Sequence, residues 1–335
     1  MNRQDFLQQL GERLGSMDGQ ERADVLRYFD ELIQDKAADS ERSEEEVILD
    51  LGPLDAVAKA VLEGSAQRPA DPGGAGTSSP ASGPVVKTVQ VEALQVRNLV
   101  VRAYDMRIII RPGNADEVVL TYPQDDDLRF DVSLQDGQLQ LIQERILRFR
   151  LFGIGWVVNA PTLEVTVTLP KDFAASLDAQ TSNGRIMMSG IDVWGSLRLN
   201  SSNGRIEVVQ SRAKEMDVRT SNGRVVAQDV SAQGMLSLKT SNGRIEADRV
   251  RSDAALTLQS SNGSLRFSQL QANDLTLRTS NSTIEGSVSG SAEDYTVISA
   301  TSNGKNGLKE HRANGPKRLD VHTSNGSIRV QFEQQ

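Results

Sequence analysis

The tripeptide Ser-Asn-Gly recurs through the C-terminal half of the chain, and this repetition constrains the fold more than any other feature. It occurs eight times, once as Ser-Asn-Ser, and successive asparagines are 19 to 22 residues apart. A fixed period of this length is typical of repeat architectures, in which each repeat is one structural unit stacked on the next. The asparagines are Asn183, Asn203, Asn222, Asn242, Asn262, Asn281, Asn303 and Asn325.

The residues around each asparagine alternate between apolar and polar. Apolar residues stand six and four positions before the asparagine and three after it in nearly every repeat, as Met216, Val218 and Val225 do around Asn222. The position two before the asparagine is always Thr or Ser and faces the same way as the apolar residues. A period of two predicts β-strands with one inward face. Each repeat is therefore predicted to be a strand, a tight turn and a second strand.

Two architectures fit this pattern, an antiparallel meander and a parallel β-solenoid. We favour a mainly β fold built as a parallel β-solenoid of about 20-residue coils, because the meander leaves one apolar face bare. Stacked coils place equivalent residues about 4.8 Å apart, so the asparagine amides are expected to form a hydrogen-bonded ladder. Glycine is expected to supply a positive φ at the corner. On that basis Gly223→Val should cost more than ~1 kcal/mol, and the same change at Ser282 should cost less.

The rest of the chain divides by composition. Residues 1–63 carry apolar residues at helical spacing and are predicted to form a small all-α domain. Asp18 is a candidate N-cap, and Ser43 with Glu46 forms a capping-box pattern. Residues 64–84, rich in Gly, Pro, Ser and Ala, are predicted to be a disordered linker. Residues 85–170 are predicted to be N-terminal strands and a cap, with a hairpin at Asp136-Gly137, and residues 171–335 the solenoid.

Charge and composition narrow the function classes. Residues 1–64 hold 16 acidic and 7 basic residues, a net of -9, so with a chain total of -8 the remainder nets about +1. There is no cysteine, which excludes disulfides, thiolate metal sites and a cysteine nucleophile. No signal-peptide pattern opens the sequence, and no apolar run reaches the about 18 residues of a membrane span. We expect a cytoplasmic location, with at most peripheral contact at the inner membrane face.

The repeated unit Thr-Ser-Asn-Gly-Arg-Ile resembles that of the bacterial putative-adhesin family, an uncharacterised family of β-strand-repeat proteins. The resemblance covers about residues 88–335 and includes the segment Leu163 to Pro170. Residues 1–63 resemble the HAAS-type helical signalling domain, through Phe6-Leu7-x-x-Leu10, Tyr28-Phe29 and the segment from Ser43 to Pro53. These resemblances imply a bacterial protein linked to envelope signalling or stress response, and they imply no established reaction.

Basic residues flank the turns and are the first candidate site. In stacked coils they form a column at the outer edge that is suited to anionic glycan, wall polymer or lipid head groups. The alternative is a solvated edge that discourages lateral aggregation. Glu207, Glu246 and Glu285 lie two residues further along and are expected to neutralise part of the column. The candidate residues are Arg185, Arg205, Arg224, Arg244, Arg219 and Lys239.

The second candidate is the apolar loop that contains Phe152, Ile154 and Trp156, which is expected either to cap the end of the solenoid or to dock onto a partner. Catalysis has little support. The chain has two histidines, and no Gly-x-Ser-x-Gly, HExxH or P-loop motif is present. We predict no catalytic residue, metal, cofactor or nucleic-acid partner.

The sequence thus favours a non-enzymatic binding or scaffold protein. The acidic helical domain is expected to dock a protein partner, and the linker would hold the solenoid near it. The solenoid is expected to present a repetitive surface, with anionic polymer as the candidate ligand. Two alternatives remain: a scaffold in which solenoids stack end to end, and a carbohydrate-active β-helix enzyme.

Overall fold

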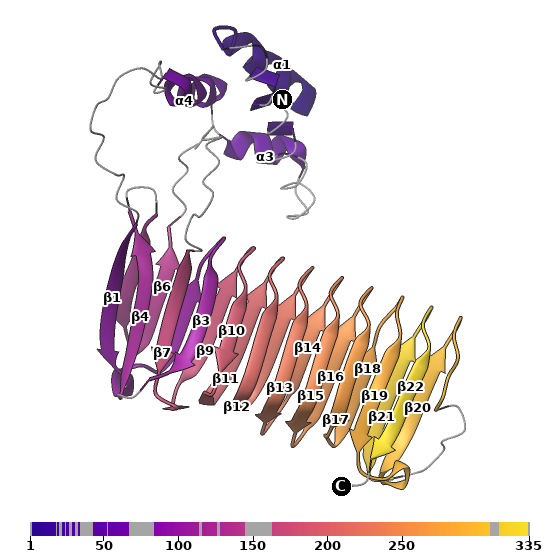
Figure 1. Ribbon diagram of the computed structural model, residues 1–335. Coiled ribbons are helices and arrows are strands. Elements are labelled where there is room, and N and C mark those ends of the chain that lie inside the picture. The colour runs from indigo at the N-terminus through magenta and orange to yellow at the C-terminus, as the bar shows by residue number, and fades with distance from the viewer. Residues whose placement is uncertain are drawn as a thin grey trace, which may run out of the picture. The chain divides into compact units, whose positions relative to one another are not determined.

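The computed structural model describes residues 2–17, 19, 22–23, 25–26, 29–30, 33, 43–51, 53–66, 84–113, 116–125, 128–144, 163–308 and 315–333. These residues fall into two compact units, a helical one within residues 1–81 and a β-rich one that includes residues 84–144 and 163–333 (Figure 1). Each unit has its own hydrophobic core.

The helical unit contains α1 (Arg3–Arg13), α3 (Glu44–Asp50) and α4 (Leu54–Ala66), and the described residues between 19 and 33 are also helical. The predicted capping box is confirmed at α3, where the Glu46 N–H donates to Ser43 Oγ and the Ser43 N–H donates to Glu46 Oε2. The candidate cap Asp18 lies outside the described residues. Phe6 and Phe29 meet edge to face, with ring centroids 5.9 Å apart. Both rings belong to the hydrophobic core of this unit, which contains Phe6, Leu10, Leu14, Val25, Phe29, Ile33, Val47, Ile48, Val57, Ala58 and Val61.

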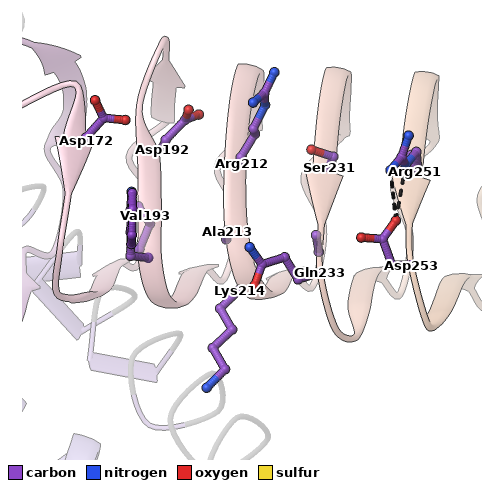
Figure 2. Close-up of a pocket in the computed structure, with 12 residues that line it drawn as sticks. Asp172, Asp192, Val193, Arg212, Ala213, Lys214, Ser231, Gln233, Arg251 and Asp253 are labelled. Atoms are coloured by element: carbon purple, nitrogen blue, oxygen red, sulfur yellow. Dashed lines mark hydrogen bonds and ion pairs between the residues drawn. The ribbon is translucent and has the colours of Figure 1, made fainter.

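The β-rich unit is a parallel β-solenoid, which confirms the predicted fold class (Figure 1). Equivalent residues of successive repeats pair in register, as Ile186 with Ile206 and Ile206 with Val225 do. The strands that lead into the Ser-Asn-Gly turns form one sheet, which we call the leading sheet, and those that follow the turns form the trailing sheet. A short third side joins each trailing strand to the next leading strand, and Figure 2 shows part of it.

In spatial order, the leading sheet contains β5 (Phe130–Gln135), β6 (Gln138–Gln143), β2 (Asn98–Arg102), β9 (Ser176–Thr181), the end of β11 (Asp192–Ser201), the end of β12 (Ile206–Thr220), β14 (Leu236–Thr240), β16 (Ala255–Ser260), β18 (Asp274–Arg278), β21 (Lys317–Thr323) and β20 (Tyr295–Thr301). The trailing sheet contains β1 (Val85–Glu92), β4 (Glu117–Gln124), β7 (Glu164–Leu169), β3 (Arg107–Pro112), β10 (Ile186–Ser189), the start of β12, β13 (Val225–Ala232), β15 (Ile245–Ser252), β17 (Leu265–Leu270), β19 (Ile284–Ser289) and β22 (Ile328–Glu333). The third side begins with β8 (Asp172–Phe173) and the start of β11, and the short helices η1 (Ala93–Gln95) and η2 (Ala292–Asp294) complete the elements.

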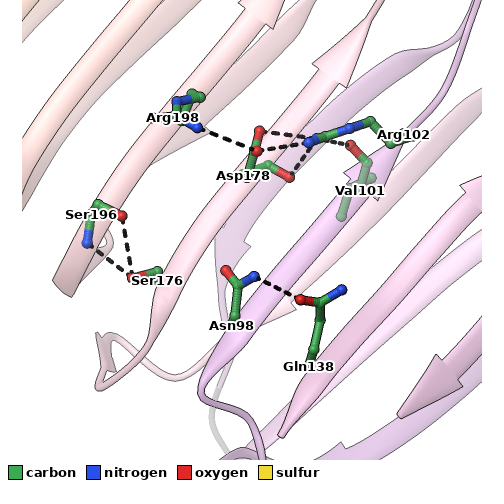
Figure 3. A network of polar contacts seen from close by, with 8 residues as sticks. All are labelled: Asn98, Val101, Arg102, Gln138, Ser176, Asp178, Ser196 and Arg198. Atoms are coloured by element: carbon green, nitrogen blue, oxygen red, sulfur yellow. Dashed lines mark hydrogen bonds and ion pairs between the residues drawn. The ribbon is translucent and has the colours of Figure 1, made fainter. Parts of the chain in front are cut away.

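The coils at both ends are out of sequence order. At the C-terminal end, β21 lies between β18 and β20, although β20 precedes it in the chain. At the N-terminal end, β2 lies between β6 and β9, and β3 lies between β7 and β10. Arg102 of β2 holds Asp178 of β9 with two hydrogen bonds of 2.9 and 2.7 Å, as Figure 3 shows. The coil formed by β2 and β3, which is the first in the sequence, carries no Ser-Asn-Gly turn. For that reason the repeat pattern did not reveal it.

The solenoid core includes most of the inward residues that the alternation predicted, and these are almost fully buried. The hairpin predicted at Asp136-Gly137 joins β5 to β6, with φ of 50° and 80° at the two turn residues. The outermost C-terminal coil departs from the pattern with two polar residues, Ser299 and Asn306. They satisfy each other, because Asn306 Nδ2 donates to Ser299 Oγ at 3.0 Å.

Candidate functional site

The turn asparagines form a continuous ladder along one edge of the solenoid. Each side-chain amide donates from Nδ2 to Oδ1 of the neighbouring asparagine, at 2.6 to 2.8 Å. All the amides point the same way, so Asn183 at one end needs an acceptor from the first coil. Asp105 provides it at 2.5 Å. A carboxylate at the donor end of aligned amide dipoles is favourable, and the ladder thereby extends to a coil without its own asparagine.

The Thr and Ser hydroxyls beneath the turns tie each coil to the one before it. Thr220 Oγ1 donates to the Gly204 carbonyl at 3.1 Å and accepts the Gly223 N–H at 3.2 Å. Equivalent bonds recur at Ser201, Thr240 and Ser260. These hydroxyls are buried, as the alternation indicated. The hydroxyl is needed because a buried donor and a buried acceptor would otherwise lack partners.

The expected reason for glycine at the turns is wrong. Among the described residues, positive φ at glycine occurs at Gly137, Gly190, Gly286 and Gly290, and none of these belongs to a Ser-Asn-Gly turn. The turn glycines are required because adjacent coils approach too closely for a side chain. A Cβ on Gly223 would lie 2.0 Å from the Gly204 carbonyl oxygen. Where serine replaces glycine, at Ser282, its hydroxyl donates to the Asn262 carbonyl at 2.8 Å.

Positive φ occurs instead at the next corner, seven residues after the asparagine. Four of the five residues stacked there are not glycine, and their φ angles lie between 46° and 55°. Arg249 and Asp229 lie on adjacent coils and form an ion pair at this corner, and the hydrogen bond from Arg249 lowers the pKa of Asp229. The corner is formed by Gly190, Gln210, Asp229, Arg249 and Gln269.

Four of the predicted basic residues form a column on the outer face of the trailing sheet. Their spacing is fixed by backbone bonds between coils, such as the Ile186 N–H to the Arg205 carbonyl at 3.0 Å. Arg107 precedes Ile108, which pairs with Ile186, so it extends the column by one coil. Sequence reasoning missed Arg107 because its coil lacks the repeat motif. We call Arg107, Arg185, Arg205, Arg224 and Arg244 the arginine column.

Glutamates neutralise the column only in part. Arg205 pairs with Glu207 at 3.0 Å, while Arg224 and Arg244 share Glu246 at 3.6 and 3.3 Å. Arg107 lies 3.8 Å from Glu164. Arg185 is exposed and has no ion pair within the described part of the chain. Five arginines thus face three glutamates, and the column keeps an excess of positive charge. Glu285 instead pairs with Arg266 and Arg329 further along the same sheet.

Arg219 and Lys239 do not join this column. They are neighbours in register on β12 and β14, in the leading sheet, whose outer face is directed away from the trailing sheet. Arg219 pairs with Asp217 at 2.9 Å. The six predicted residues therefore divide between two faces of the solenoid.

Three further expectations concern the apolar loop, a metal site and a membrane span. The loop with Phe152, Ile154 and Trp156 lies outside the described residues. Among the residues that are described, no group of three or more His, Asp or Glu side chains is placed to hold a metal ion. No helix in the described ranges is long and apolar enough to cross a membrane.

The geometry defines a class of repeat protein: a parallel β-solenoid whose coils are joined by an amide ladder, a hydroxyl ladder and close glycine contacts. The sequence profile of the Toastrack DUF4097 family matches residues 96–331, and the chain belongs to that family. The HAAS profile matches residues 5–60, which confirms the second resemblance found in the sequence.

Solved structures similar to this chain include a putative adhesin from Bacteroides fragilis, which is 13% identical with a TM-score of 0.40, over 74% of this chain and 97% of that chain. A putative adhesin from Parabacteroides merdae is 12% identical with a TM-score of 0.32, over 76% and 97%. A putative cell adhesion protein from Clostridium sporogenes is 10% identical with a TM-score of 0.25, over 75% and 100%. A comparison with the curated proteins finds no match.

Proposed function

We propose that the chain is a non-enzymatic binding protein of the bacterial envelope response, in which the solenoid binds an anionic polymer and the helical unit docks a protein partner. The proposal places the protein in the cytoplasm or at the inner face of the membrane. The observation that carries it is the arginine column. Its backbone positions repeat about every 4.8 Å along the sheet, and its arginines retain more positive charge than the neighbouring glutamates neutralise.

A repeating anion is the ligand that such a column fits. Guanidinium groups bind phosphate and carboxylate through paired, charge-assisted hydrogen bonds. The parallel sheet holds the side chains in one row. Once a polymer has bound one of them, binding to the next is intramolecular and costs no further loss of translational freedom. In-register like charges also repel one another in the free protein, and a bound polyanion would remove that repulsion.

The helical unit has a different character. Residues 1–64 have a net charge of -9 while the rest of the chain nets about +1, so the helical unit is not expected to bind the same ligand. Leu49 on α3 is 77% exposed, and the first turn of that helix carries Glu44, Glu45 and Glu46. An exposed leucine among carboxylates fits a protein partner with an apolar pocket rimmed by basic groups. Leu49→Asp should abolish capture of that partner by chemical crosslinking without unfolding the unit, because the side chain is already in solvent.

The solenoid proposal is tested with the full chain and two defined probes, a glycerol-phosphate polymer and phosphatidylglycerol vesicles, with phosphatidylcholine vesicles as the neutral reference. Changing Arg185, Arg205, Arg224 and Arg244 together to Gln should abolish binding. Binding by the wild type should weaken as salt rises from about 0.05 to 0.5 M, because exposed charges are screened.

A matched control separates the column from net charge. Arg185→Gln with Arg224→Gln and Arg219→Gln with Lys239→Gln each remove two positive charges, from the trailing and the leading sheet respectively. Only the first pair should weaken binding. Equal losses would show that overall charge, and not the column, attracts the probe. If the wild type binds neither probe, the proposal for the solenoid is wrong.

A further inference from the structure

A second surface lies on the third side of the solenoid, around an exposed tryptophan. Trp194 is 69% exposed, although the residue before it, Val193, is buried in the core. The register between β11 and β12 shifts between Val193 and Ser196, so Trp194 stands on a β-bulge. Bulges are known to redirect side chains near functional sites.

The bulge is built by a close contact that only glycine allows. A Cβ on Gly195 would lie 2.5 Å from Ser176 Oγ and 2.8 Å from the Ala175 carbonyl oxygen of the neighbouring coil. The backbone therefore packs tightly just after Trp194, while the indole itself remains in solvent. A tryptophan side chain has only two rotatable bonds, so it loses little entropy when a ligand covers it.

Trp194 borders a shallow pocket of about 360 Å³, within the size range of small-molecule sites of roughly 300–1,000 Å³. Asp172, Asp192 and Arg212 occupy register-paired positions on three successive strands and project to the same side of the ribbon (Figure 2). Within the described residues, none of these three forms an ion pair, whereas Arg251 and Asp253 pair at 3.0 Å. The charged residues that line the pocket are Asp172, Asp192, Asp253, Arg212, Lys214 and Arg251.

The composition of this pocket indicates what it would bind. Three carboxylates balance three basic groups, so the pocket as a whole attracts neither anions nor cations. Asp172 and Asp192 are paired on neighbouring strands, and their carboxylates accept hydrogen bonds, while Arg212 and Lys214 donate them. The indole adds one flat apolar face. A matching ligand is uncharged, has hydroxyl groups that both donate and accept, and has one apolar face.

We infer that this pocket binds an uncharged pyranose unit of a glycan, stacked on Trp194 and hydrogen-bonded through its hydroxyls to Asp172, Asp192 and Arg212. A protein segment is a poorer match, because its apolar side chains would leave the charged groups around the indole without partners. A polyanion is a poorer match because of the two adjacent aspartates. The inference does not depend on the arginine column, which lies on the trailing sheet.

The test uses the full chain with Trp156→Phe, which leaves Trp194 as the single tryptophan of the chain. The probes are maltohexaose, cellohexaose and the hexamer of N-acetylglucosamine. At least one should shift the tryptophan emission in a saturable way at concentrations up to about 10 mM, the range of weak recognition. Binding should be unchanged between about 0.05 and 0.5 M salt, because the ligand is uncharged.

Calorimetry with the otherwise unchanged chain then identifies the residues. Trp194→Ala should weaken binding about tenfold or more, and so should Asp192→Asn. Met235→Ala is the matched control, since Met235 is also exposed, at 58%, but does not line this pocket, so its removal should have no effect. Failure of all three probes to bind, or full binding by Trp194→Ala, would overturn the inference. A protein partner would then be the candidate ligand of the exposed indole.

Discussion

Replacing Gly223 with alanine tests why the turns of this solenoid contain glycine. The added Cβ would lie 2.0 Å from the carbonyl oxygen of Gly204 and 2.5 Å from its carbonyl carbon. Both are backbone atoms of the neighbouring coil, so no side-chain rotation relieves the overlap. Since ordinary contacts lie at about 3.5 Å or more, the two coils must separate by roughly 1 Å or more at this corner.

The expected loss of stability follows from the hydrogen bonds that cross this corner. The N–H groups of Ser221 and Asn222 donate to the Ser202 carbonyl at 3.0 and 2.9 Å, and the Thr220 hydroxyl donates to the Gly204 carbonyl at 3.1 Å. At about 1 kcal/mol for each bond, their weakening removes about 3 kcal/mol. Alanine also lowers the conformational entropy of the unfolded chain, which stabilises the folded state by about 0.4–1 kcal/mol. The net loss should be about 2–3 kcal/mol in the free energy of unfolding.

Denaturation in guanidinium chloride, followed by circular dichroism, measures this loss, and Gly190→Ala is the control. Gly190 has a φ of 69°, but a Cβ there would lie 3.6 Å from its nearest neighbour, Pro112 Cγ. Gly190→Ala therefore isolates the cost of left-handed backbone, about 1–2 kcal/mol before the gain from restricting the unfolded chain. The close-contact explanation is refuted if Gly223→Ala costs less than Gly190→Ala, or less than about 1 kcal/mol.

Three further predictions concern the hydroxyl ladder, a buried phenol and the order of the coils. Thr220→Val should cost about 1–3 kcal/mol in chemical denaturation, because it removes the partner of the Gly223 N–H, while Thr220→Ser should be nearly neutral. Burial raises the pKa of Tyr295 to about 12, so the folded state holds this proton more tightly than the unfolded state, and stability should fall between about pH 10 and pH 12. Denaturation at high pH checks this, and Tyr295→Phe should lose that part of the pH dependence. Deleting residues 315–335 should abolish the hydrogen-exchange protection of β20, since β21 is the strand that pairs with it; retained protection would contradict the spatial order.

The repeat predicted most of the fold because its signals were local. Alternating apolar residues determine which side of a strand faces inward, and a constant period determines that equivalent residues stack. The capping box at Ser43 and the hairpin at Asp136 were predictable for the same reason, since each depends on residues close in sequence. The positive-φ corner was not predictable, because Gln210, Asp229, Arg249 and Gln269 give no glycine signal there.

The candidate site was predictable only in part. Four members of the arginine column follow the motif, but the fifth, Arg107, belongs to a coil with Asp105 in place of the turn asparagine. Assigning Arg219 and Lys239 to the same column failed because two positions that flank a turn lie on different sheets once the coil closes. Trp194 drew no attention, because one tryptophan on a bulge leaves no periodic signal.

The order of the end coils bears on whether such solenoids can stack end to end. The coil that contains β20 carries the polar residues Ser299 and Asn306 at inward positions, whereas β21 carries Leu319 and Val321, so β21 is better suited to follow β18 although β20 comes first in the chain. The result is a tapered C-terminal end: β20 extends the leading sheet by one strand, whereas among the described residues the trailing sheet beyond β22 is continued by a single bridge from Asn306 to Ile328. At the other end, β1, β4 and β5 pair antiparallel with their neighbours.

A second copy would therefore have to join an incomplete parallel coil to antiparallel edges, and the ladder of asparagines and hydroxyls could not continue across that junction. End-to-end growth is thus disfavoured by both ends, and light scattering should show no increase in mass as the protein concentration rises.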